Sequence, residues 1–252
     1  MKVHRPPSLA KVRMCMVVYG LTDTGKTQLL GSAQQCEATS PTLFIDVDQG
    51  TLTLAGMDIA VASPTNFGEL QDVFDELRTG GSGFRSVCFD SLTAQQRDIS
   101  MPTILGTLDE DQTLTDLSRT APPTQQDWLR SGFQMRQLLQ AFRSLAKSGK
   151  EKNRMHVFMS AGERVDDRRD IGVPSLPGVL ALEVGGYVDV LARLVLQPPD
   201  EDDKKEARYL LTTKHLDDDG FYYLAKNRLR LLPPRMKNPT IEKILNHWNA
   251  AK

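Results

Sequence analysis

One stretch near the start of the chain limits the possible folds more than any other. The apolar run Met14 to Tyr19 leads into the pattern Gly-x-x-x-x-Gly-Lys-Thr, which ends at Thr27, and a helix-forming stretch follows. A strand, a glycine-rich loop and a helix in this order are the setting of a polyphosphate-binding P-loop. Gly20 and Gly25 let the backbone bend so that its N–H groups point inward. The pattern therefore predicts a site for a nucleoside triphosphate.

The residues of this loop have different expected parts in binding. Lys26 supplies a positive charge to the outer phosphates, and the Thr27 hydroxyl is placed to ligate Mg²⁺. The helix that opens near Lys26 adds its positive dipole end. Asp23 is unusual in such a loop, and we expect its charge to point away from the phosphates. The predicted nucleotide contacts are Gly20, Leu21, Thr22, Asp23, Thr24, Gly25, Lys26, Thr27 and Gln28.

The composition limits the setting in which this site works. The chain has 252 residues, of which 40% are hydrophobic and 25% charged, as in ordinary globular proteins. Its formal net charge of −1 gives no overall field that attracts nucleic acid or a membrane. No stretch approaches the roughly twenty apolar residues that cross a membrane, and residues 1–7 lack the apolar core of a signal peptide. Three widely spaced cysteines suit a reducing compartment. We therefore expect a soluble cytoplasmic protein without a membrane partner.

Apolar runs and helical periodicity alternate along the chain and predict an α/β fold. We expect one domain over residues 12–252, preceded by a basic arm of residues 1–11, with a mostly parallel central sheet flanked by helices. Residues 209–213 and 221–224, joined around Asp219-Gly220, predict an antiparallel C-terminal hairpin. The other expected strands are 14–19, 42–48, 58–62, 85–91, 155–160 and 187–196, and the expected helices are 26–34, 66–79, one after residue 123, 176–184 and one opened by Asn238-Pro239.

Two of the expected helices carry an apolar stripe, and two segments carry no periodicity. The long helix after residue 123 is expected to bury Trp128, Met135, Leu138, Phe142 and Leu145, and the last helix Ile241, Ile244, Leu245 and Trp248. Residues 93–123 and the charged stretch 162–170 lack a pattern, so we expect them to be loops.

Carboxylates at the ends of two expected strands are candidates for metal binding and catalysis. Asp90 ends a strand where a parallel sheet presents ligands beside the P-loop, and we expect it to bind Mg²⁺ together with Thr27. A cap of the next turn is the alternative for Asp90. Asp46 and Asp48 follow an earlier strand, and one of them could polarise the attacking water. For this pair, a turn ahead of Gly50 is the alternative.

The order of these motifs resembles the RecA/RadA recombinase core. Phe44-Ile45-Asp46-Val47-Asp48 and Val87-Cys88-Phe89-Asp90-Ser91 carry this resemblance. Later stretches resemble the small single-domain RecA-like ATPases of bacteriophages, which accompany single-strand annealing proteins. These stretches are Thr124 to Trp128, Leu176 to Gly178, Tyr187 to Val190, and Leu224 to Arg228 followed by Leu232-Pro233. The resemblance spans about Val12 to Trp248 and implies a RecA-like P-loop fold and Mg²⁺-dependent ATP hydrolysis.

The resemblance also implies roles for individual residues. Asp48 falls where RecA-like enzymes usually carry the glutamate that activates water, and its shorter side chain departs from that pattern. Asp90 matches the magnesium carboxylate. Lys226 and Arg228 match a Lys-x-Arg pair that reaches the γ-phosphate of a neighbouring subunit, which implies self-assembly into a ring or filament with this pair acting in trans. Glu163 lies near the position that senses the γ-phosphate. Without the resemblance, Lys226 and Arg228 would be interpreted as a solvated pair on an edge strand.

Single-stranded DNA and a single-strand annealing protein are the partners that the resemblance implies. The DNA-contacting loops would be residues 93–123 and 162–173. The first loop carries Arg97 and Arg119 and the second Arg164, Arg168 and Arg169, in each case among a larger number of acidic residues. Neither loop is net basic, so the charges do not indicate DNA binding. Two other hypotheses stay open, namely a P-loop kinase for a small substrate and a nucleotide-switched binding module with little turnover.

Overall fold

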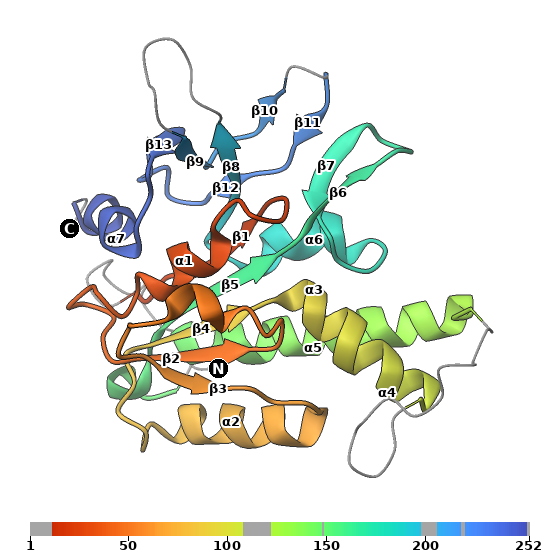
Figure 1. Cartoon of the computed structure of the whole chain (residues 1–252), viewed down its shortest axis with the longest axis horizontal. Coiled ribbons are helices and arrows are strands. Elements are labelled where there is room, and N and C mark those ends of the chain that lie inside the picture. Colours follow the sequence, from red (N-terminus) through yellow and green to blue (C-terminus); the bar gives the residue numbers. More distant parts are fainter. Residues whose placement is uncertain (1–11, 108–121, 148, 198–205, 218–219, 251–252) are drawn as a thin grey trace, which may run out of the picture.

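The computed structural model describes residues 12–107, 122–147, 149–197, 206–217 and 220–250 (Figure 1). The predicted arm of residues 1–11 and the larger part of the predicted 93–123 loop, with Arg119, lie outside the described residues. No helix among the described residues is long and apolar enough to span a membrane.

The central sheet has parallel strands in its middle and antiparallel strands at one side. Its order is β13-β9-β8-β1-β5-β4-β2-β3, with β12 also paired to β8. Strands β8 to β3 in this order are parallel, and β9, β12 and β13 run antiparallel to their neighbours. The bounds are β1 Cys15–Tyr19, β2 Thr42–Asp46, β3 Ala60–Ala62, β4 Ser86–Asp90, β5 His156–Ala161, β8 Val190–Gln197, β9 Ala207–Leu211, β12 Lys226–Asn227 and β13 Arg235–Lys237. The expected mostly parallel sheet is confirmed.

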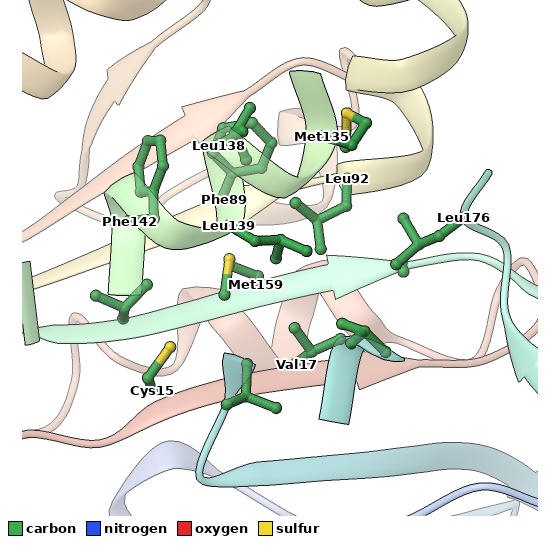
Figure 2. Close-up of a cluster of buried hydrophobic side chains, with 14 of the residues drawn as sticks. Cys15, Val17, Phe89, Leu92, Met135, Leu138, Leu139, Phe142, Met159 and Leu176 are labelled. Atoms are coloured by element: carbon green, nitrogen blue, oxygen red, sulfur yellow. The ribbon is translucent and has the colours of Figure 1, made fainter. Parts of the chain in front are cut away.

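Helices cover both faces of this sheet. Side chains of a strand alternate between the faces, so each central strand contributes to two cores. Cys15, Val17 and Tyr19 of β1 belong to the core that packs against α2 (Phe67–Thr79), α5 (Gln125–Lys147) and α6 (Leu180–Tyr187). Figure 2 shows this core, in which α5 points Met135, Leu139 and Phe142 at the sheet. Met14, Met16 and Val18 belong to the opposite core, with α1 (Lys26–Gly31) and α7 (Ile241–Asn249). Strands β1, β2, β4 and β5 are therefore buried on both sides, which explains their nearly continuous apolar sequences.

Helix ends and apolar stripes follow the local sequence in most places. Asn66 caps α2 by accepting a hydrogen bond from the Glu69 N–H at 3.0 Å, and Gly80 ends that helix with a φ of 74°. All four residues predicted for the stripe of α7 are buried. Trp128 is an exception, since it is 45% exposed and does not belong to the buried stripe of α5. The helix α1 ends three residues earlier than expected, and β3 begins two residues later than expected.

An antiparallel hairpin near the C-terminus is confirmed, since His215–Leu216 pairs antiparallel with Tyr222–Tyr223, but its first strand is not the predicted 209–213. The predicted 162–170 loop is wrong at Glu163–Asp166, which is a strand. These strands belong to a second sheet. Its order is β10-β11-β7-β6. The bounds are β6 Glu163–Asp166, β7 Ile171–Pro174, β10 His215–Leu216 and β11 Tyr222–Tyr223. The strand β11 pairs with β10 and β7, whereas β9 pairs with β8 and β13 of the central sheet. The two strands that the hairpin prediction joined therefore belong to different sheets, although an antiparallel set of strands near the C-terminus is present.

The expected loop after β4 is wrong for residues 92–105, which are helical. They form α3 (Leu92–Ala94), a π-helix η3 (Gln95–Ser100) and α4 (Met101–Leu105). Two short 3-10 helices, η2 (Thr51–Leu54) and η4 (Glu151–Asn153), complete the elements. A π-helix has a wider turn than an α-helix, so it shifts the buried face along the segment. This shift removes the regular apolar spacing by which a helix is recognised in a sequence.

Candidate functional site

The P-loop follows β1 and lies at the carboxyl edge of the parallel strands. Close approach to β8 requires the first glycine, because a Cβ at Gly20 would lie 2.3 Å from the Leu194 carbonyl oxygen. Gly25 has a φ of 87° and is the residue ahead of α1, where a side chain would be strained and would meet Arg208. Asp23 is exposed and also has a positive φ of 64°. Both glycines therefore stand at positions where the backbone leaves no room for a side chain, as the motif predicted.

Lys26 lies at the first position of α1 and turns its amino group back to the loop. Its Nζ donates to the carbonyl oxygens of Leu21 at 2.6 Å and Gly20 at 3.0 Å. Burial lowers the pKa of Lys26, and the nearby carboxylates of Asp90 and Asp48 oppose this shift. The ammonium group is therefore held beside the loop, where a polyphosphate would exchange the two carbonyl contacts for charged oxygens.

Thr27 and Asp90 meet although they are far apart in sequence. The Thr27 hydroxyl donates to Asp90 Oδ2 at 2.6 Å, and the Ser160 hydroxyl donates to Oδ1 of the same carboxylate. Asp90 is 2% exposed, and its burial raises its pKa, which the hydroxyl hydrogen bonds oppose. A buried carboxylate with hydroxyl groups beside it, and with no cation bonded to it in the part of the chain that the structure describes, suits a hard cation such as Mg²⁺, which prefers oxygen ligands. The predicted metal ligands therefore lie together.

Asp46 and Asp48 have different surroundings. Asp46 is 4% exposed, and its Oδ1 accepts from the Gly50 N–H at 3.1 Å, so it forms the turn that was the alternative for this pair. The side chain of Asp48 is 48% exposed and lies 3.4 Å from Arg97 Nη2. Backbone hydrogen bonds from Val47 and Asp48 to the Asp90 carbonyl bring this segment to the end of β4. Of the two, Asp48 faces the phosphate side of the loop.

Glu163 begins β6 and is held by a buried ion pair. Both of its oxygens accept from Arg193 of β8 at 2.8 Å, and its side chain is only 4% exposed. The Arg193 guanidinium also stacks 3.2 Å from the centre of the Tyr223 ring. Glu163 therefore joins the central sheet to the second sheet beside the P-loop, with a cation already bound to its carboxylate.

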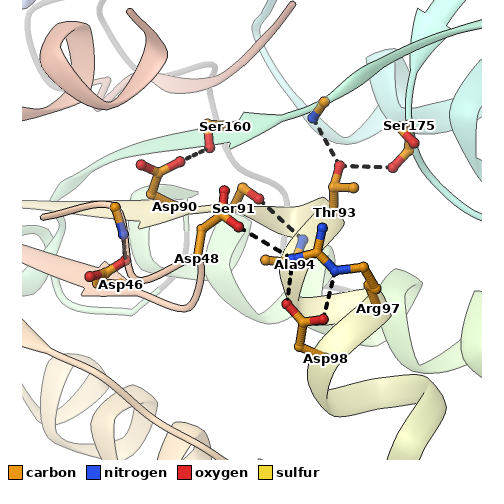
Figure 3. Close-up of polar contacts among 12 residues, drawn as sticks. Asp46, Asp48, Asp90, Ser91, Thr93, Ala94, Arg97, Asp98, Ser160 and Ser175 are labelled. Atoms are coloured by element: carbon orange, nitrogen blue, oxygen red, sulfur yellow. Dashed lines mark hydrogen bonds and ion pairs between the residues drawn. The ribbon is translucent and has the colours of Figure 1, made fainter. Parts of the chain in front are cut away.

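A pocket of about 240 Å³ lies on the phosphate side of the P-loop. Thr93 connects two segments that line this pocket. The Thr93 hydroxyl donates to the Ser175 carbonyl at 2.9 Å and accepts from the Gly162 N–H at 2.8 Å. Figure 3 shows Thr93 and Arg97 next to the carboxylates at this edge of the sheet. The lining residues are Gly20, Leu21, Thr22, Lys26, Asp48, Ser91, Thr93, Ala94, Arg97, Gly162, Glu163 and Ser175.

A second pocket, of about 260 Å³, lies on the other side of the P-loop. Its lining includes Gly25, Gln28, Met57, Arg208 and Thr240. Arg208 of β9 donates to Gln28 Oε1 at 2.5 Å, and its Nε is buried without a hydrogen-bond partner among the described residues. The loop thus separates two pockets, one with the charged groups and one lined by a mixture of polar and apolar side chains.

The structure does not bring Lys226 and Arg228 to either pocket. Lys226 pairs with Leu191 near the start of β8, and Leu191 pairs with Val17, whereas the P-loop begins beyond Tyr19. Lys226 Nζ donates to the carbonyl oxygens of Gly185 and Val188, and Arg228 lies 3.4 Å from the Val188 oxygen. Both cations therefore point to the amino edge of the sheet, away from the chain's own P-loop.

Sequence reasoning missed three of the polar residues at the carboxyl edge. It assigned Arg97 to a DNA-binding loop and gave no role to Ser160 or Arg193. Ser160 ends a predicted strand and could have been noticed, but its contact with Asp90 depends on the order of strands in the sheet. Among the described residues, no group of three or more His, Cys, Asp or Glu side chains forms a metal site.

Comparisons with known proteins extend this description. A family model described as an AAA domain matches residues 13–229. No curated protein matches the chain. The crystal structure of the RadB recombinase is similar with a TM-score of 0.43 and 15% identity, and the match covers 83% of this chain and 90% of that chain. The X-ray structure of the Legionella pneumophila ATPase DotB is similar with a TM-score of 0.34 and 12% identity, over 98% of this chain and 57% of that chain.

Proposed function

The chain belongs to the AAA domain family, and from this premise we propose that it is a RecA-like, Mg²⁺-dependent ATPase that acts on single-stranded DNA in recombination, annealing or repair. The observation that carries the proposal is the contact of Thr27 with the buried Asp90 carboxylate, next to Lys26. In P-loop enzymes a hydroxyl and a carboxylate in these positions hold Mg²⁺, and the lysine neutralises the outer phosphates. The ion would supply charge stabilisation for the transferred phosphoryl group.

The two pockets divide the substrate between them. The phosphates would lie on the P-loop with their outer end in the pocket of Lys26 and Asp48, and the nucleoside would lie in the pocket of Gln28 and Arg208. Asp48 orients a water molecule whose oxygen forms a bond to the γ-phosphorus while the bond to the bridging oxygen breaks. ADP leaves, and the proton of the water passes through Asp48 to the released phosphate. Glu163 reports the γ-phosphate through its ion pair with Arg193.

Lys226 and Arg228 would complete the site of a neighbouring copy. They lie at the amino edge of the sheet, beyond reach of the chain's own P-loop, which supports a role in trans within a ring or filament. An arginine supplied in trans is worth about 10³–10⁵ in rate in related systems. Mixing Arg228→Ala with Lys26→Ala tests this role, because each inactive variant retains the half that the other lacks. Partial recovery of hydrolysis supports a shared site, and no recovery indicates a self-contained one.

The resemblance of the motifs is the support for four further parts of the proposal. These are binding of single-stranded DNA, a partner annealing protein, a bacteriophage source and action in the host cytoplasm. The charged hairpin of β6 and β7 does not strengthen the DNA part, since Arg169 is already paired with Asp166 at 2.9 Å. The test is phosphate release by the wild type and Lys26→Ala, with and without single-stranded DNA at low salt. We expect Mg²⁺-dependent hydrolysis that DNA stimulates and Lys26→Ala abolishes.

Other outcomes of the same assay separate the alternatives. Hydrolysis that does not change with DNA concentration would remove DNA from the proposal. Tight ATP binding without phosphate release would favour a nucleotide-switched binding module. Transfer of phosphate to a nucleoside or nucleotide would favour a small-substrate kinase.

A further inference from the structure

Arg97 lies in a helical segment that lines the phosphate-side pocket, and not in a loop. It belongs to the π-helix η3, which follows β4 after the short helix α3. Ser91 caps α3 by accepting from the Ala94 N–H at 3.1 Å, so the helical segment starts directly after Asp90. This start carries Arg97 back over the carboxyl edge of the sheet, where it lines the same pocket as Lys26 and Asp48.

Two carboxylates hold the guanidinium of Arg97. Its Nε and Nη2 each donate to Asp98 at 2.6 Å, and Nη2 also lies 3.4 Å from Asp48 Oδ1 (Figure 3). The hydrogen bonds that Arg97 donates to Asp98 raise the pKa of Arg97, so its charge persists at every working pH. The adjacent Asp98 thus fixes the guanidinium, and the guanidinium in turn contacts Asp48.

Asp48 needs a cation beside it if it is to work next to a triphosphate. An unpaired carboxylate there would be repelled by the γ-phosphate, and its free rotation would leave the water unoriented. The other cations nearby are committed elsewhere, because Arg193 is bound to Glu163 and Lys26 faces the P-loop carbonyls. Arg97 is the cation in contact with Asp48 among the described residues.

We propose that Arg97 is a positioning residue of the ATPase site, which holds the Asp48 carboxylate in place through the guanidinium that Asp98 fixes. This inference rests on the proposed function, since it assigns Arg97 a part in the same hydrolysis. The contact also gives the short Asp48 side chain, in place of the longer glutamate usual in RecA-like enzymes, a defined orientation. Arg97 acts through Asp48 and within one chain, in contrast to Lys226 and Arg228.

Arg97→Ala is compared with Arg97→Lys and with the control Arg78→Ala. Arg78 is a matched control because it is 61% exposed against 63% for Arg97 and also pairs with a nearby aspartate, Asp75, but lies on α2 outside the pocket. We expect Arg97→Ala to lower kcat about 10-fold, as for loss of a hydrogen bond to a charged group, with KM for ATP changed less than about threefold. Arg97→Lys should recover part of kcat, and Arg78→Ala should match the wild type.

A double-mutant cycle with Asp48→Asn tests whether Arg97 acts through Asp48. If it does, Arg97→Ala costs less than about twofold in kcat when Asp48→Asn is already present. Equal losses in both backgrounds would overturn the inference, as would a loss that appears only in KM or only in DNA affinity. A normal rate for Arg97→Ala in an active wild type would overturn the inference and leave the proposed function standing. No hydrolysis by the wild type would overturn both.

Discussion

Two buried aspartates lie at opposite edges of the central sheet, and they differ in what balances their charge. Asp90, at the end of β4, is 2% exposed and is bound by the hydroxyls of Thr27 and Ser160. Asp189, just before β8, is 4% exposed and accepts from Lys147 Nζ at 2.6 Å and from the Cys15 N–H at 3.0 Å. A cation is therefore bonded directly to the Asp189 carboxylate, whereas among the described residues hydroxyl groups and no cation are bonded to the Asp90 carboxylate.

This difference fits the proposed function, in which Asp90 binds an ion and Asp189 has a structural role. A buried carboxylate without a bonded cation costs folding free energy, and such unbalanced charges are found where a site binds a charged ligand. In the proposal Asp90 would receive its cation from solution, whereas Asp189 is already paired with Lys147. Asp189 also lies 3.9 Å from Arg228, so the same carboxylate helps to hold the amino-edge pair. Four predictions test this comparison.

The largest expected effect is on hydrolysis. Asp90→Asn keeps the shape of the side chain but removes the negative charge from the proposed ion site, so kcat should fall by about 100- to 1,000-fold. Phosphate release measured over a range of Mg²⁺ concentrations checks this. Asp189→Asn serves as the comparison and should lower kcat far less than Asp90→Asn at matched folded protein concentration, because Asp189 lies at the opposite edge of the sheet and contacts Arg228 only at 3.9 Å. Similar losses in both variants would contradict the functional distinction.

The second effect concerns folding at the amino edge. Asp189→Asn should lower the free energy of unfolding by about 2 kcal/mol, because Lys147 loses its partner but keeps some contact with water. Urea denaturation followed by circular dichroism measures the change. The double variant Asp189→Asn with Lys147→Met should recover most of the loss, since it removes both charges. If it is as unstable as the single variant, the ion pair is not the cause.

A smaller effect, of opposite sign, is expected at the carboxyl edge. In metal-free and nucleotide-free buffer, Asp90→Asn should raise the free energy of unfolding by on the order of 1 kcal/mol, because it removes an unbalanced buried charge. Thermal unfolding in the presence of a chelator detects this. Destabilisation by Asp90→Asn would show that the hydroxyl contacts already balance the carboxylate.

The smallest effect is the pH dependence of the increase in unfolding free energy that Asp90→Asn is expected to cause. The folded state raises the pKa of Asp90, so it retains the proton to a higher pH than the unfolded chain does. The free energy of unfolding of the wild type therefore falls as pH rises from about 4, the ordinary aspartate pKa, to the raised pKa of Asp90 in the folded state. The stability difference between Asp90→Asn and the wild type should be small below pH 4 and grow as pH rises. A difference independent of pH would exclude titration of Asp90 as its source.

Most of the parallel sheet could be predicted because its elements carry local patterns. The strands around Phe44, Phe89 and Phe158 are continuous apolar runs bounded by polar residues, and α7 has a clear stripe. The π-helix at Gln95 to Ser100 could not be predicted, because its wide turn removes the helical spacing. Of the second sheet, only β11 lies within a predicted strand, 221–224. The pairing of the sheet could not be predicted, since β10 and β11 are two residues long and are held by their partners, not by their own sequence.

The sequence by itself determined the P-loop and the class of fold, and it indicated the residues proposed to bind magnesium, because these depend on short segments with strict residue requirements. Only the tertiary structure decided which distant side chains share the site. The order of strands places Ser160 of β5 next to Asp90 of β4, and the π-helix turns Arg97 to Asp48. The tertiary structure also places Lys226 and Arg228 at the amino edge of the sheet, opposite the edge that carries the P-loop. Such contacts depend on strand order and on the rotation of a helix, which the residues of one segment do not specify.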